Sequence, residues 1–208
     1  ELKSTDEFTK ANALRKLTFL QMMGYDMSWA SFPVIEIMSS TRFAHKRVGY
    51  LAATQGFTED TDVILLCTNL LKKELLSTEV YEAGLAVNCL SNIVTEDLAR
   101  DLLSDLTVLT QHSAPYVRKK AILGLFKLFM KYPQGLRLTF DRIQQCLNDS
   151  DPSVVSCAVN VITELSDKNP KNYLVMAPQF FQLLTSSTNN WTLIKVLRSR
   201  EVFSMLLF

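Results

Sequence analysis

Apolar residues along the chain recur at intervals of three and four, which is the spacing of one face of an α-helix. The pattern is clear near the start, where Phe8, Ala11 and Leu14 follow polar residues. Ser4 and Glu7 have the spacing of a capping box, so we expect Ser4 to cap this first helix. The predicted helical segments are approximately residues 4–24, 28–38, 42–55, 61–71, 78–93, 95–111, 113–132, 136–147, a segment from 151, 173–184 and a segment from 190.

Polar residues and helix breakers separate these segments. Thr95 is followed by two acidic residues and Asp151 by Pro152, and both patterns are typical of helix starts. A polar junction at residues 72–74 and Ser77 is expected to divide two helices. No segment alternates as a strand would, and six Gly and six Pro are few for a many-stranded sheet. The sequence therefore predicts an all-α protein.

The helical segments repeat along the chain. A small residue occurs one to two turns into every second helix, where it lets a neighbouring helix approach closely: Ala13, Gly49, Gly84, Ala121 and Ala158. The steps between these positions are 36, 35, 37 and 37 residues. A period of about 36 residues with two helices per unit indicates an α-solenoid.

The segment at residues 151–158 resembles the opening of the second helix in HEAT repeats, which often reads Asp-Pro-x-Val-Arg-x-x-Ala. Val155 stands where the Arg is usual, whereas Arg118 keeps this Arg in the preceding unit. The resemblance implies a right-handed α-solenoid of HEAT/armadillo-like helix pairs.

The balance of charge limits the classes of partner. The formal net charge is +1, so no overall field attracts nucleic acid or anionic lipid, and we expect no nucleic-acid partner. No run of 18 apolar residues predicts a transmembrane helix. The four cysteines form no C-x-x-C pair, which favours free thiols in a reducing cytosol over a metal site.

Residues suited to catalysis are sparse. His45 and His112 lie far apart in the sequence, and neither has an acidic or cysteine neighbour at the spacing of metal ligands. The chain contains no nucleophile elbow, phosphate-binding glycine loop or H-E-x-x-H motif. We therefore expect no enzymatic activity, no cofactor and no metal.

Cations in the segment 113–132 divide into two groups. Lys120, Lys127 and Lys131 share one helical face, which is a candidate partner-binding surface or simply a solvated face. Lys46 and Arg47 occupy the matching place two repeats earlier, and the same two interpretations apply to them.

Arg118 differs from these lysines because it falls within the apolar arc of its helix. We expect it to have a structural role, as an ion pair with an acidic residue at the junction of the next repeat. Asp149 and Asp151 are the two candidate partners.

Several longer motifs resemble signature stretches of the adaptin large-subunit trunk. They are Tyr25-Asp26-Met27-Ser28-Trp29-Ala30, Lys46-Arg47-Val48-Gly49-Tyr50-Leu51, Pro115-Tyr116-Val117-Arg118-Lys119-Lys120-Ala121, Asn169-Pro170-Lys171-Asn172-Tyr173 and Asn189-Asn190-Trp191-Thr192-Leu193-Ile194-Lys195. The resemblance covers residues 1–197, which we interpret as one trunk segment. Residues 198–208 depart from the family pattern, and we expect this apolar tail to be exposed or folded back as a cap.

The resemblance implies a cytoplasmic scaffold that associates peripherally with Golgi and endosomal membranes as part of a complex. Its implied partners are a small sigma-type subunit, a beta-type large subunit and a mu-type subunit, with an Arf-type GTPase for recruitment. The implied role is vesicle-mediated protein transport towards lysosome-related compartments. The repeats alone also permit a generic HEAT scaffold that is unrelated to vesicle coats.

Overall fold

The computed structural model describes residues 1–199, and this part of the chain contains eleven α-helices, three 3-10 helices and no strand. The predicted all-α class is therefore confirmed. The α-helices are α1 (Glu7–Met22), α2 (Ser31–Met38), α3 (Phe43–Gly56), α4 (Ile64–Leu75), α5 (Val80–Ile93), α6 (Glu96–Leu109), α7 (Pro115–Lys131), α8 (Gln134–Gln145), α9 (Pro152–Ser166), α10 (Ala177–Ser186) and α11 (Asn190–Arg198). The 3-10 helices are η1 (Ser28–Ala30), η2 (Cys146–Asn148) and η3 (Pro170–Met176).

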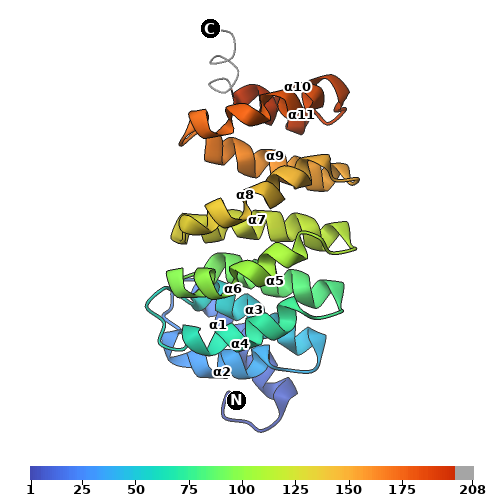
Figure 1. Ribbon diagram of the computed structural model, residues 1–208. Coiled ribbons are helices and arrows are strands. Elements are labelled where there is room, and N and C mark those ends of the chain that lie inside the picture. The colour runs from blue at the N-terminus through green and yellow to red at the C-terminus, as the bar shows by residue number, and fades with distance from the viewer. Residues whose placement is uncertain (200–208) are drawn as a thin grey trace.

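The helices stack along one direction from the N-terminal to the C-terminal end (Figure 1). One layer, which we name the B layer, consists of α1, α3, α5, α7, α9 and α11, each packed against the next. A second layer, the A layer, contains α2, α4, α6, α8 and α10, and α2, α4, α6 and α8 pack successively. Each A-layer helix also packs against the B-layer helix that follows it in the chain. This arrangement is the predicted solenoid of helix pairs.

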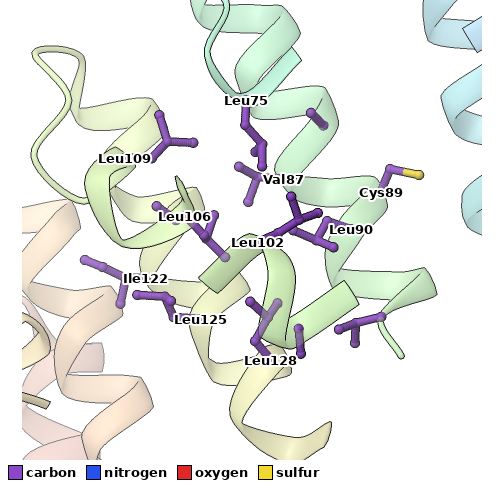
Figure 2. Packing of buried hydrophobic residues seen from close by; sticks show 14 of the residues in the cluster. Leu75, Val87, Cys89, Leu90, Leu102, Leu106, Leu109, Ile122, Leu125 and Leu128 are labelled. Carbon is purple, nitrogen blue, oxygen red and sulfur yellow. The ribbon is translucent and has the colours of Figure 1, made fainter. Parts of the chain in front are cut away.

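The apolar core is continuous along the stack. Buried side chains reach from Ala11 in α1 to Val196 in α11. Figure 2 shows one section of this core, where Leu90, Leu102 and Ile122 come from three successive helices. Because one repeat covers the apolar face of another, burial of these side chains holds the repeats together.

The small residues of the repeat stand at close contacts between helices. A Cβ atom on Gly49 would lie 2.5 Å from the backbone nitrogen of Met38, so α3 crosses the backbone of α2 at this point. A Cβ atom on Gly84 would lie 2.4 Å from Cε1 of Tyr116 in α7. Ala121 and Ala158 are fully buried. The repeat of small residues therefore marks packing contacts, as its spacing predicts.

The N-cap residues predicted from the sequence are confirmed at two helix starts and wrong at a third. Thr95 accepts from the Leu98 amide at 3.3 Å, and Asp151 accepts from the Ser153 amide at 2.8 Å. The prediction for Ser4 is wrong, because Asp6 caps α1 by accepting from the Thr9 amide at 2.9 Å. The helix begins at Glu7, which is too late for Ser4 to be its N-cap.

The predicted junction between the next two helices is right at Ser77 and wrong at residues 72–74. These residues form the last turn of α4, and the break between α4 and α5 lies at residues 76–79. Glu74 is buried within this turn, where an ion pair with Lys46 compensates its charge. A run of charged residues can therefore continue a helix when one of its members has a buried partner.

The sequence also led us to expect no transmembrane helix and an apolar tail that is exposed or folded back. None of the helices described in residues 1–199 has both the length and the apolar content needed to cross a membrane. The expectation for the tail at residues 198–208 concerns mostly residues 200–208, which lie outside the described part of the chain.

The contact at Gly49 generates a test of the close helix crossing. Gly49→Ala should destabilise the chain by about 2 kcal/mol, because its Cβ would collide with the backbone of α2 and overpack the contact. This cost should exceed the gain of about 1 kcal/mol that alanine brings within a helix. Urea unfolding followed by circular dichroism measures the change.

Gly56→Ala at the end of the same helix is the matched control. Its Cβ would meet the side-chain end of Gln21 at 2.9 Å, and that flexible side chain can move away. We expect a change within about 0.5 kcal/mol for this control. Equal unfolding midpoints for the two variants would contradict the crossing inferred at Gly49.

Candidate functional site

Three cations occupy the same place in three repeats of the B layer. Lys10, Lys46 and Arg118 each lie three residues before the small residue of their helix. Each forms an ion pair with an acidic residue in or shortly after an A-layer helix: Lys10 with Glu36, Lys46 with Glu74, and Arg118 with Asp149. The three acids lie in the last turns of an A-layer helix or shortly after it. We name these contacts the inter-repeat ion pairs.

Lys46 is the most deeply buried member of this series, with 6% of its surface exposed. Its Nζ lies 2.8 Å from Oε2 of Glu74 and 2.7 Å from Oε1 of Glu82, so it joins α3 to both α4 and α5. Burial lowers the pKa of Lys46, but its hydrogen bonds to Glu74 and Glu82 outweigh this effect and leave the pKa raised. The expectation that Lys46 belongs to an exposed surface is therefore corrected.

Arg118 makes four hydrogen bonds from the first turn of α7. Its Nε and Nη2 donate to the two carboxylate oxygens of Asp149 at 2.8 and 2.7 Å. Its Nη1 donates to the carbonyl oxygens of His112 and Ser113, both at 2.9 Å. Both side chains of the ion pair are 12% exposed, so the planar guanidinium is held in a fixed orientation with little water around it.

The two acids predicted for Arg118 have separate roles. The Asp149 carboxylate accepts hydrogen bonds from the Arg118 guanidinium and, at 2.8 Å, from the backbone amide of Asp151. The Asp151 side chain instead caps the N-terminus of α9. Burial raises the pKa of Asp149, but the hydrogen bonds from Arg118 and from the Asp151 amide leave it lower than its ordinary value. The pKa of Arg118 is raised chiefly by its hydrogen bond to Asp149.

Two repeats have no cation at the corresponding place. Tyr81 stands three residues before Gly84, and Val155 stands three residues before Ala158. The Tyr81 ring packs against the Tyr116 ring at 6.0 Å between centroids, while Val155 packs against the apolar core. Ring and apolar contacts therefore replace the ion pair in these two repeats.

Sequence reasoning missed several contacts between repeats. The pairs of Lys10 and Lys46 could have been found from their common offset before Ala13 and Gly49. Arg142 in α8 donates to the hydroxyl of Thr110 at 2.9 Å and to its carbonyl at 3.2 Å. No local motif signals this contact, since the two residues are 32 positions apart.

The other predicted surface cations fall into two places. Arg47 and Lys120 line one cavity of about 390 Å³ between α3, α5 and α7, and Arg47 also lines the neighbouring cavity between α1 and α3. Lys127 and Lys131 line another, of about 470 Å³, and Lys131 forms an ion pair with Glu59. The structure therefore does not unite Lys120 with Lys127 and Lys131 in one cavity.

The two histidines make contacts of different range, because His45 in α3 approaches Glu7 in α1 whereas His112 contacts a residue two positions away. His45 Nδ1 lies 3.7 Å from a carboxylate oxygen of Glu7, and His112 Nδ1 accepts from the Ala114 amide at 3.0 Å. In the part of the chain that the structure describes, no three His, Cys, Asp or Glu side chains are grouped so as to hold a metal ion.

The comparisons with known proteins identify the family. The family model for the adaptin N terminal region matches residues 1–201. The chain belongs to the adaptin family. The predicted resemblance to the adaptin trunk is therefore confirmed.

Curated adaptins are similar over most of this chain. It is 56% identical to the AP-3 complex subunit delta-1 of Bos taurus over 198 residues, which are 95% of this chain and 16% of that protein. For the AP-3 complex subunit delta of Arabidopsis thaliana the identity is 47%, covering 95% of this chain and 23% of that protein. The AP-1 complex subunit gamma-1 of Mycosarcoma maydis is 32% identical, and the match covers 78% of this chain and 19% of that protein. The chain thus spans less than a quarter of each of these relatives.

Solved structures agree with the adaptin fold. A homology model of the full-length AP-3 complex in an intermediate open conformation matches with a TM-score of 0.83 and 46% identity, covering 97% of this chain and 35% of that chain. A designed armadillo repeat protein in complex with a (KR)4 peptide matches with a TM-score of 0.70 and 19% identity, and the match covers 97% of this chain and 96% of that chain. The second similarity shows the solenoid fold alone.

The inter-repeat ion pair of Arg118 generates a stability prediction. Arg118→Ala should destabilise the adaptin chain by about 2–3 kcal/mol, because Asp149 and two backbone carbonyls lose their donors. Arg118→Lys should recover only part of this loss, since one ammonium cannot replace the two parallel hydrogen bonds. Arg100→Ala, at an exposed ion pair with Asp97, should change stability by less than about 0.5 kcal/mol. Similar losses for Arg118→Ala and Arg100→Ala in urea unfolding would contradict this account.

The lowered pKa of Asp149 generates a pH prediction. A carboxylate with a depressed pKa in the folded state contributes stability above its ordinary pKa of 3.8, and this contribution is lost as the pH falls through the folded value. The stability difference between the unsubstituted chain and Asp149→Asn should therefore be constant near neutral pH and shrink below pH 3.8. Unfolding by urea across this range measures it. A difference that persists unchanged at the lowest pH would argue against the ion pair.

Proposed function

We propose that this chain is a trunk segment of an adaptor-complex large subunit of the delta-adaptin type and acts as a protein-binding scaffold in vesicle-mediated transport. The observation that carries the proposal is 56% identity over 95% of the chain to an AP-3 complex subunit delta-1. The alternative, a generic HEAT scaffold unrelated to vesicle coats, accounts for the repeats but not for this identity. We propose residues 1–197 as the trunk segment and residues 198–208 as a divergent tail.

The surface of the B layer supports a scaffold role. A cavity of about 430 Å³ between α1 and α3 is lined mainly by apolar side chains. Among these, Phe19 is 62% exposed, Met22 67% and Leu51 48%. Contiguous exposed apolar side chains are typical of a surface that binds another protein. We propose that a small sigma-type adaptor subunit covers the part of this cavity formed by Phe19, Met22 and Leu51.

The remaining partners follow from the same proposal. A beta-type large subunit and a mu-type subunit would complete the complex, and an Arf-type GTPase would recruit it to Golgi and endosomal membranes. The chain would then be cytoplasmic and peripheral on the membrane, serving transport to lysosome-related compartments without catalysis. Lys127 and Lys131 are exposed at the end of α7, and we retain them as proposed contacts for a protein partner.

Co-expression with a sigma-type subunit tests the proposal. We expect the two chains to elute together in size-exclusion chromatography. The double variant Met22→Asp with Leu51→Asp should reduce capture at least about tenfold, because it places two charges in the apolar cavity.

Leu138→Asp in α8 is the control, since Leu138 is 75% exposed and lies in the A layer. This variant should retain capture. The scaffold assignment fails if a chain that is folded by circular dichroism captures no sigma-type subunit. If both variants capture equally well, the assignment of the α1–α3 cavity fails.

A further inference from the structure

We propose that the groove between α3, α5 and α7 binds an acidic peptide segment in an extended conformation. This inference goes beyond the proposed function, because it requires this chain alone and no other adaptor subunit. The groove has a volume of about 390 Å³, which accommodates a few side chains. The groove is lined by residues that include Phe43, Arg47, Tyr81, Gly84, Tyr116 and Lys120.

Aromatic side chains preform the groove. A Cβ atom on Gly84 would lie 2.4 Å from Cε1 of Tyr116, so the Tyr116 ring lies directly on the backbone of α5. The Tyr81 ring packs against it at 6.0 Å between centroids, with 56° between the ring planes. Tyr81 itself is 68% exposed, so its ring forms a wall that a ligand can reach. Rings held in this way contribute contact area with little loss of side-chain freedom.

The groove is positively charged. Arg47 is exposed, and Lys120 is half-buried with its Nζ 5.9 Å from the centre of the Tyr116 ring. Lys119 lies near the same ring, with its Nζ 5.8 Å from the centre. Within residues 1–199 none of these three cations forms an ion pair, unlike Lys46 and Arg118 on the same two helices.

The acids near the groove do not compensate these cations. No Asp or Glu is among the described residues that line it. Glu82 follows Tyr81 in the sequence, but its carboxylate accepts hydrogen bonds from Lys46 and Ser77 at 2.7 Å each. The field in the groove therefore favours an anionic occupant.

The shape of the groove favours a peptide over a membrane surface. Lys120 is half-buried between helices, whereas a flat bilayer meets the most exposed cations of a protein first. The groove runs across three neighbouring helices, and packed helices lie about 8–10 Å apart. An extended chain advances about 3.3 Å per residue, so about six residues would cross the groove. Asn88 is exposed in α5 along this path and can hydrogen-bond with a peptide backbone.

Fluorescence anisotropy with the complete 208-residue chain tests the proposal. The probe is a short fluorescein-labelled peptide of glutamate and glycine with one central phenylalanine. The double variant Arg47→Glu with Lys120→Glu should weaken binding at least about tenfold, since two attractive contacts become repulsive. Tyr81→Ala should weaken it about threefold or more without changing the net charge.

The control is Lys73→Glu with Lys171→Glu, which makes the same change in net charge at exposed sites outside the groove lining. We expect this variant to weaken binding less than about twofold in physiological salt, where distant charges are screened. Equal losses for the two double variants would show non-specific charge attraction and overturn the proposal. Undiminished binding by the Arg47→Glu, Lys120→Glu variant would also overturn it.

A second arm uses phosphatidylcholine vesicles that contain phosphatidylserine. The proposal is overturned if the unsubstituted chain sediments with these vesicles, the Arg47→Glu, Lys120→Glu variant does not, and neither binds the peptide. That result would assign the groove to a membrane surface. Sedimentation that is unaffected by the two substitutions, with peptide binding that depends on them, supports the proposal. Neither arm includes a sigma-type subunit, so their outcome is separate from that of the co-elution experiment.

Discussion

The covering of one repeat's apolar face by its neighbours is the constraint on which this structure depends. No helix pair can bury its own apolar surface completely, so the core runs without interruption from Ala11 to Val196. The small residues of the B layer permit this packing, because helix backbones or rings stand where larger side chains would otherwise extend. Stability is therefore shared between neighbours, and an individual repeat has little stability by itself.

The inter-repeat ion pairs act within this apolar framework. Replacing a buried ion pair by well-packed apolar residues often preserves stability, so the pairs are weak evidence for a gain in stability. Removing one partner is costly, however, because a buried charge is left without compensation. We therefore interpret Lys46 and Arg118 as residues that select the register between an A-layer helix and the B-layer helices beside it. A shifted register would leave Glu74 or Asp149 buried without its cation.

The sequence predicts the helices and their repeat because both depend on spacing that is visible within one segment. It places Arg118 within an apolar arc, and this position implies a partner in the next repeat. The position of Lys46 on its own helix does not predict its burial, because this burial depends on Glu74 at the end of another helix. Only the offset before a small residue that Lys46 shares with Arg118 signals it. The N-cap of α1 is ambiguous for a different reason, since Ser4, Thr5 and Asp6 are all suitable caps and local spacing does not choose among them. The groove at Tyr81 needs the fold, because its walls come from three helices.

The ion pair between Lys131 and Glu59 joins residues 72 positions apart, whereas the other contacts between repeats discussed above span about half that separation or less. It links the end of α7 to the connection between α3 and α4, and so passes over the repeat that contains α5. Both side chains are substantially exposed, so the pair adds little to stability. Its geometry depends instead on how α5 packs against α3 on one side and against α7 on the other. Any change in the way α3, α5 and α7 stack would move the two charges relative to each other, so the distance between Lys131 and Glu59 reports the relative placement of two repeats that are not neighbours.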